Sequence, residues 1–195
     1  WPGGLLSRLV VVSVRGMPDC FSRWRAQYPL RFGAGCALAV AAIGIASNGA
    51  TSGAGYEPTR ALLEGTGDAP GIFTLLKFCA TWLSVWSGVP GGLFAPSLAI
   101  GASLGNDVAL ITGVGSEAAI PLIALGMVGF LAAATQGPIT AFIIVMEMVA
   151  GHAMVLSLMA SALLASGVAR WIGGSLYVEL AGLLMAPPGT IDARR

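Results

Sequence analysis

Charged residues are scarce in this chain. Of its 195 residues, 10% are Asp, Glu, Lys or Arg, whereas soluble domains carry about 25%. Hydrophobic residues make up 56% of the sequence, and the mean hydropathy is +0.83. A soluble fold of this size would need several helices that are apolar on every side, which excludes an ordinary soluble domain. The net charge of +1 provides no basic surface, so nucleic acid is excluded as a partner.

Residues that carry catalytic or metal-binding chemistry are also few. His152 is the single histidine, and it follows Gly151 at an expected helix boundary. A solvated, interfacial imidazole is expected there rather than half of a Ser–His pair. No His, Asp or Glu residues have the spacing of metal ligands. Cys20, Cys36 and Cys79 are far apart, which indicates small buried residues and no disulfide framework. The sequence therefore predicts no enzyme, no metal site and no cofactor.

The sequence does contain long apolar runs. Four intervals lack Asp, Glu, Lys and Arg altogether, namely residues 32–56, 78–106, 118–146 and 148–169. Each exceeds the roughly 20 residues that span the hydrocarbon core of a bilayer. The sequence thus predicts a multi-pass integral membrane protein with the lipid bilayer around it.

Glycine and proline interrupt these apolar runs. We expect helices over residues 29–46, 57–65, 72–87, 93–110, 118–134, 139–150, 155–171 and 175–185. Several are too short to cross a membrane, and broken or half-length apolar helices are typical of transporter cores. In the first helix, Gly and Ala have the spacing that lets membrane helices approach closely.

This pattern divides the chain into three parts. Residues 1–28 contain four arginines and are interpreted as an interfacial connector. Residues 29–186 form the expected membrane domain, and residues 187–195 form a tail. The first residues have neither an initiator Met nor the features of a signal peptide, so we expect a piece of a longer chain.

The most informative break is Trp86-Ser-Gly-Val-Pro-Gly-Gly-Leu-Phe-Ala-Pro96. Pro90 lacks an amide hydrogen, and the neighbouring glycines favour flexible or positive-φ backbone, so a new helix should start near Leu93. The free amides at that start lie at the positive end of the helix dipole and need an anion, water or a protein group, because hydrocarbon cannot satisfy them. The sequence predicts an anion site inside the membrane.

Two further residues invite functional interpretations. Glu147 lies in an apolar segment, where a carboxylate either serves as a proton relay or ion ligand or faces the interior and bonds to free backbone; we favour the second. Tyr177 follows Gly173-Gly174 and could donate one neutral hydrogen bond to an anion, which suits rapid release. Taken alone, Tyr177 would be an aromatic residue of the membrane interface.

Several motifs occur together in a familiar order. Gly92-Leu-Phe-Ala-Pro96 fits the pattern Gly-x-Phe-x-Pro. Its neighbours are Ala50-Thr-Ser-Gly-Ala-Gly55, Ser87-Gly-Val-Pro-Gly91, Gly126-Met-Val-Gly-Phe-Leu-Ala-Ala-Ala134, Gly137-Pro-Ile-Thr-Ala-Phe-Ile-Ile-Val-Met-Glu-Met148 and Ser175-Leu-Tyr177. Over nearly its whole length, the chain resembles the CLC family of chloride channels and proton-coupled chloride antiporters.

The resemblance implies an all-α integral membrane fold, a bundle of tilted, broken and half-spanning helices. This chain would be the second of two inverted repeats. The N-terminal half of the same protein would complete the pore and supply its gating glutamate, and two copies would form a homodimer. The expected location is a prokaryotic inner or plasma membrane.

The resemblance also implies a site. The backbone amides of Leu93 and Phe94 and the hydroxyl of Tyr177 would bind a dehydrated chloride. Gly92 would permit a close approach to the helix start, while Gly91, Ala95 and Pro96 would support the motif. Chloride is then a transported ligand and not a cofactor.

The implied function is transmembrane chloride transport, either as a channel of the voltage-gated type or as an H⁺/Cl⁻ antiporter that also moves protons. The alternative is a partial chain that serves as a structural membrane subunit without its own pore. Two residues depart from common family usage: Ser175 stands where proline is frequent, and Glu179 places a charge just after Tyr177. We expect Glu179 to face solvent or a polar partner, because in the pore it would repel anions.

Overall fold

The structure is a computed structural model that describes residues 28–172, except residues 50, 52, 54, 66–70, 88–91 and 150–151. This part of the chain contains seven α-helices and one short 3-10 helix, and no strand. The elements are α3 (Pro29–Ala46), α4 (Tyr56–Leu63), α5 (Gly71–Trp86), α6 (Phe94–Thr112), α7 (Ser116–Thr135), α8 (Pro138–Val149), η1 (His152–Met154) and α9 (Val155–Ile172). The predicted all-α fold is confirmed.

Most helix ends lie within two residues of their predicted positions, because glycine and proline determine them. Helix α3 begins at Pro29, where a fixed φ and a missing amide hydrogen are tolerated. Helix α6 ends at Gly113, whose φ of 68° is left-handed. Helix α7 begins earlier than expected, at Ser116, and is 20 residues long. Its apolar part, Ala119–Thr135, is shorter than a full span, as the sequence predicts, and α7 contains Pro121.

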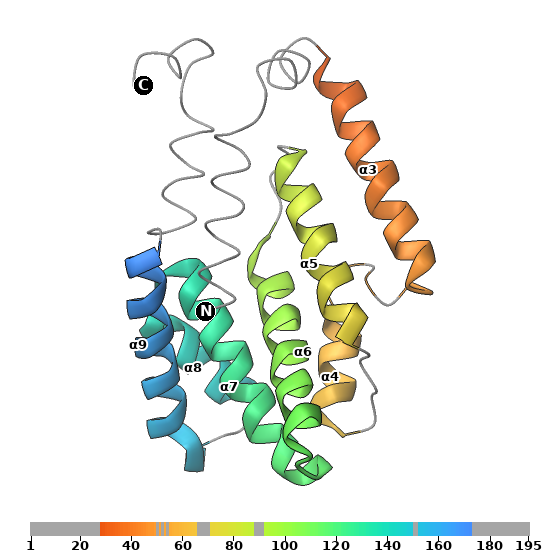
Figure 1. Cartoon of the computed structure of the whole chain (residues 1–195). Coiled ribbons are helices and arrows are strands. Elements are labelled where there is room, and N and C mark those ends of the chain that lie inside the picture. Colours follow the sequence, from red (N-terminus) through yellow and green to blue (C-terminus); the bar gives the residue numbers. More distant parts are fainter. Residues whose placement is uncertain are drawn as a thin grey trace, which may run out of the picture.

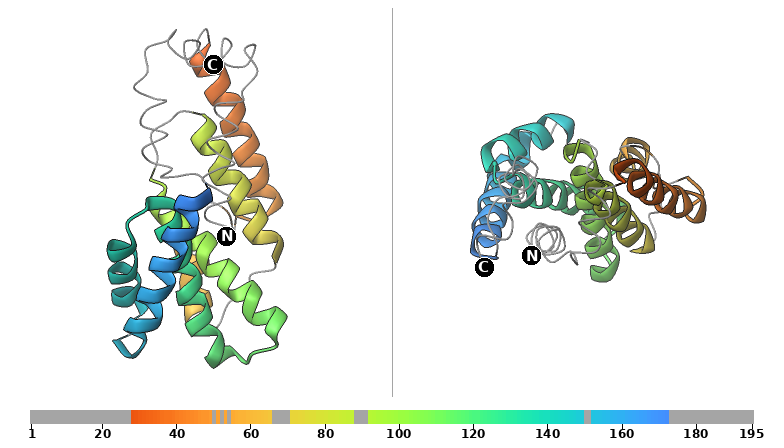
Figure 2. Two further views of the ribbon diagram at one scale, coloured as in Figure 1. Left: turned by 60° about the vertical axis from the view of Figure 1, so that its left-hand side comes forward. Right: turned by 90° about the horizontal axis from the view of Figure 1, so that it is seen from above.

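The helices form a curved row with α6 and α7 in its middle (Figures 1 and 2). Helices α8 and α9 pack on α7, and α4 and α5 pack on α6. Helix α3 lies at the end of the row against α5. The two central helices thus join the two sides of the described structure.

Glycines bring α6 and α7 into backbone contact. A Cβ atom added at Gly101 would lie 2.6 Å from the carbonyl oxygen of Gly126, and one at Gly105 would collide with the carbonyl oxygen of Leu122. Only glycine allows so close an approach, and such small-residue contacts are typical of membrane helix pairs.

The close approach predicted for α3 is not found. A Cβ atom added at Gly33 or Gly35 would meet no atom within 4 Å in the described structure. Gly33 and Gly35 therefore form no tight helix contact in the described structure, where the tight contact lies between α6 and α7.

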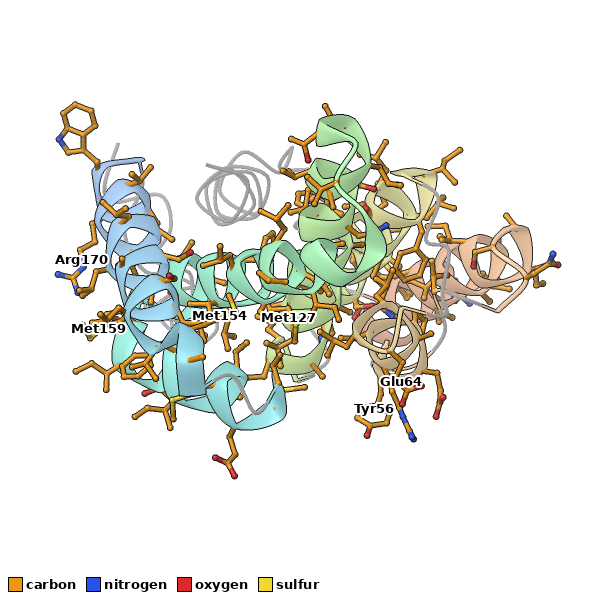
Figure 3. The ribbon with its side chains drawn as sticks, turned by 90° about the horizontal axis from the view of Figure 1, so that it is seen from below. Tyr56, Glu64, Met127, Met154, Met159 and Arg170 are labelled. Carbon is orange, nitrogen blue, oxygen red and sulfur yellow. The ribbon has the colours of Figure 1, made fainter. Side chains whose placement is uncertain are left out.

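The main core lies between α6, α7, α8 and α9. Its fully buried residues include Met127, Leu131, Val145 and Leu158. Figure 3 shows Met127 inside the bundle, whereas Arg170 projects outward from α9. A second, smaller cluster consists of Ile100 and Phe130 with partly buried neighbours from α5 and α6: Phe78, Trp82, Val85, Leu93 and Leu104.

One helix of the described residues, α6, is both long and apolar enough to cross a membrane. Shorter apolar segments lie in α3, α5, α7, α8 and α9. Large apolar side chains such as Leu38, Ile111, Leu164 and Trp171 are exposed on the outer surface. This is the arrangement of long and half-length apolar helices that the sequence predicts.

Candidate anion site at the start of α6

The first turn of α6 has backbone donors without an acceptor among the described residues. Leu93 is the N-cap residue, with helical φ and ψ of −82° and −14°, and its side chain makes no capping hydrogen bond. Phe94 and Ala95 occupy the first two helical positions, where amides have no acceptor within the helix. Pro96 has no amide hydrogen at the third position. The predicted helix start near Leu93 is confirmed to within one residue.

Ser97 closes this turn on its inner side. The amide of Ser97 donates to the carbonyl oxygen of Leu93 at 3.0 Å, and its hydroxyl donates to the same oxygen at 2.6 Å. The Ser97 side chain is only 3% exposed. The Leu93 carbonyl is thus held by two donors, which fixes the direction of the peptide that carries the Phe94 amide.

The side chains of Leu93 and Phe94 differ in burial. Leu93 packs against the Ile100 and Phe130 cluster and is half-buried. Phe94 is 39% exposed. Apolar packing therefore anchors the helix start at Leu93, and Phe94 contributes mainly through its backbone.

The described structure does not show the close approach that the resemblance implies at Gly92. It is exposed, and a Cβ atom added there would meet no atom within 4 Å among the described residues. Its φ also lies outside the left-handed region. Crowding and strain from the described residues therefore do not require glycine at this position.

Other members of the predicted site lie outside the described residues. These are Gly91 and Tyr177. Ser175, Glu179 and the tail lie outside the described residues too. The meeting of the Tyr177 hydroxyl with the amides of Leu93 and Phe94 stays a prediction. The connector lies outside the described residues except for Tyr28, and Cys20 lies outside them too.

Two side chains differ from their predicted surroundings. Glu147 is exposed on α8, so the interpretation that it faces the packed interior is wrong for the described structure. Cys79 is exposed on α5, whereas Cys36 is buried as expected.

His152 opens the 3-10 helix between α8 and α9. Within the described ranges, no three His, Cys, Asp or Glu side chains gather into a possible metal site.

The structure also reveals a buried polar contact between α5 and the loop before α4 that we did not predict. Lys77 of α5 is 2% exposed, and its Nζ atom donates to the carbonyl oxygens of Thr51 and Gly53 at 2.8 Å each. The sequence signal was a lone lysine at the centre of an otherwise apolar helix. Ion pairing does not explain it, because the ion pair seen in the described ranges joins Arg60 and Glu64.

A second polar contact joins α5 to the far end of α6. Thr74 donates a hydrogen bond to Oδ2 of Asp107 at 2.8 Å. The other carboxylate oxygen, Oδ1, is buried and has no hydrogen-bond partner among the described residues. Helices α5 and α6 are therefore tied by polar groups as well as by apolar packing.

Comparison with known proteins agrees with these features. The family model described as "Voltage gated chloride channel" matches residues 2–170. The voltage-gated ClC-type chloride channel ClcB of Yersinia pseudotuberculosis is 34% identical over 102 residues, which cover 50% of this chain and 25% of ClcB. The H(+)/Cl(−) exchange transporter ClcA of Yersinia pestis bv. Antiqua is 34% identical over 118 residues, covering 57% of this chain and 24% of ClcA.

The chain thus matches only about a quarter of the length of these curated relatives. The family match, in contrast, extends over most of the chain and includes the helix break, the start of α6 and all seven described α-helices up to the last turn of α9. The family and the apolar helices together support an integral membrane location. This chain belongs to the voltage-gated chloride channel family, the CLC family of chloride channels and H⁺/Cl⁻ exchangers.

Proposed function

We propose that the complete protein moves chloride across a membrane and that the anion binds at the start of α6. The observation that carries this proposal is the first turn of α6, where the amides of Leu93, Phe94 and Ala95 have no acceptor among the described residues, inside a chain of this family. A helix N-terminus attracts anions through these donors and through the helix dipole.

The donors proposed for this site suit an ion that must bind and then be released. Amides and a phenol replace the water around a chloride ion without a full countercharge, so the ion can bind and still leave. We propose that the Tyr177 hydroxyl supplies the side-chain donor opposite Leu93 and Phe94. The N-terminal half of the pore, which would be the first of the two inverted repeats, and a second copy in a homodimer belong to the same proposal.

Chloride flux from liposomes tests the function. The complete protein would be reconstituted with internal chloride, and external chloride and pH would be recorded together. Chloride efflux coupled to proton movement identifies an antiporter, and efflux without it identifies a channel or an uncoupled carrier. Both activities occur in the names of the relatives, one as ClcB and the other as ClcA.

The same experiment has an outcome that contradicts the proposal. If folded protein gives no more flux of chloride than empty liposomes, the start of α6 has only an architectural role. A structural membrane subunit without its own pore would then be the better interpretation.

A further inference from the structure

Lys77 connects three parts of the fold. Its Nζ atom holds the carbonyl oxygens of Thr51 and Gly53, in the segment between α3 and α4. The Thr51 hydroxyl lies 2.7 Å from the Ser47 hydroxyl, with which it shares a hydrogen bond. A buried ammonium that bonds to carbonyl groups needs strong geometric support, because leaving it unpaired is costly. Lys77 thus fixes this segment against α5.

Gly55 lies between Lys77 and α6 and so links the Lys77 contact to that helix. It is the N-cap residue of α4 and has a left-handed φ of 84°. A Cβ atom added at Gly55 would lie 2.7 Å from Cβ of Ala99 and 3.1 Å from Cε of Lys77. The segment, α5 and α6 therefore meet within the width of one side chain, at a point where only glycine fits.

The contact on α6 is near the candidate anion site. Ala99 follows Phe94 by five residues, so it lies about 8 Å further along the helix axis, given a rise of 1.5 Å per residue. Helix α6 is continuous over this distance. A displacement of Ala99 would therefore be carried to the first turn, and with it to the amides of Phe94 and Ala95.

We propose that Lys77 is a positioning residue for the anion site, which it serves by holding the segment at Thr51, Gly53 and Gly55 against the first half of α6. This inference rests on the proposed function, because it concerns the same site. Lys77 touches neither the amides nor the ion. It sets where the helix start lies.

Chloride binding by the purified complete protein tests the inference, with the dissociation constant measured by calorimetry in detergent. Lys77→Met keeps the length of the side chain and removes its donors. We expect the dissociation constant to rise at least fivefold. Lys77→Arg retains donors and charge and should recover part of the affinity.

Thr74→Val is the matched control. It also removes a buried hydrogen bond between α5 and α6, but its partner Asp107 lies near the other end of α6. This variant should lower the unfolding temperature and leave the chloride dissociation constant within twofold of wild type. If Lys77 had only a structural role, Lys77→Met would likewise unfold at a lower temperature and keep its chloride dissociation constant within twofold of wild type.

Hydrogen–deuterium exchange provides a readout that does not depend on chloride. In Lys77→Met, the bonded amide within residues 93–97, that of Ser97, should exchange faster, together with the amide of Thr51, which donates to the Ser47 hydroxyl. If only the segment exchanges faster and chloride affinity is unchanged, the inference is overturned. If Lys77→Met does not yield folded protein, Lys77→Gln, which keeps one donor group, carries the same comparison.

The two proposals fail in different ways. Wild-type protein that neither binds nor moves chloride overturns the proposed function, and the role of Lys77 with it. Wild-type protein that binds chloride beside a Lys77→Met variant with equal affinity and equal exchange at residues 93–97 overturns the role of Lys77 alone.

Discussion

Gly101 of α6 and Gly126 of α7 lie back to back where the two helices cross. A Cβ atom added at Gly101 would lie 2.6 Å from the Gly126 carbonyl oxygen, and one added at Gly126 would collide with the Gly101 carbonyl oxygen. The contact is made by main chain on both sides, so neither helix can yield by changing a rotamer. The spacing of the two central helices therefore depends on these two residues.

Gly126→Ala should destabilise the protein by about 1–3 kcal/mol, because overpacking a contact that cannot relax forces the backbone apart. Thermal unfolding of the purified complete protein measures this effect. Gly33→Ala is the control, since a Cβ atom there meets nothing within 4 Å among the described residues and alanine favours helix. Equal unfolding temperatures for Gly126→Ala and wild type would contradict the prediction.

The amide of Phe94 can be removed without removing its side chain. Incorporating phenyllactic acid at position 94 replaces the N–H group by an ester oxygen. Chloride affinity should fall about tenfold or more, because a hydrogen bond to a charged group contributes about 1.5–3 kcal/mol. Phe94→Ala is the control: it keeps the amide, and the exposed ring is not a ligand, so affinity should stay within about a factor of two. Tight binding by the ester variant would exclude this amide as a donor.

Tyr177→Phe removes only the hydroxyl group of the proposed second donor. We expect the chloride dissociation constant to rise about tenfold or more, because the phenol, like the Phe94 amide, donates to a charged ion, and such a hydrogen bond contributes about 1.5–3 kcal/mol. Tyr177→Ala should also open the pathway and alter the rate of chloride flux through liposomes. The assignment of Tyr177 would be wrong if both variants matched wild type in affinity and flux.

Asp107 offers a test of the polar contact between α5 and α6. Asp107→Asn keeps an oxygen acceptor for Thr74 and replaces Oδ1, which is buried without a partner among the described residues, by a neutral NH2 group. A buried charge costs more free energy than a buried neutral amide, so this variant should unfold at a higher temperature than wild type. Asp107→Ala leaves the buried Thr74 hydroxyl without its acceptor and should unfold at a lower one. A lower temperature for Asp107→Asn would show that the charge itself stabilises the contact.

Local rules predicted the helices well because glycine and proline act on the chain near them. Pro29 opens α3, Gly113 closes α6, and the start of α6 falls one residue after its predicted place. The helix start of the proposed anion site could be predicted for the same reason, since free amides follow directly from a helix that begins at Phe94.

Contacts between helices could not be predicted from these local glycine and proline signals. Small residues occur in α3 as well as in α6 and α7, and only the packed structure shows that Gly101, Gly105 and Gly126 make the tight contact. Lys77 was missed because its partners, the carbonyls of Thr51 and Gly53, are main-chain groups that have no sequence signal. The exposed position of Glu147 likewise depends on which face of α8 meets its neighbours.

The donors at the start of α6 belong to the main chain, which has a consequence for how this site can be found and how it can change. Alanine scanning removes side chains and leaves every amide in place, so a scan of this segment would record mainly packing at Leu93. For the same reason, a substitution that keeps the helix start deletes a donor only if it introduces proline. If the proposed function holds, a substitution in this segment that introduces no proline would change ion preference through the residues that aim these amides or line the path beside them.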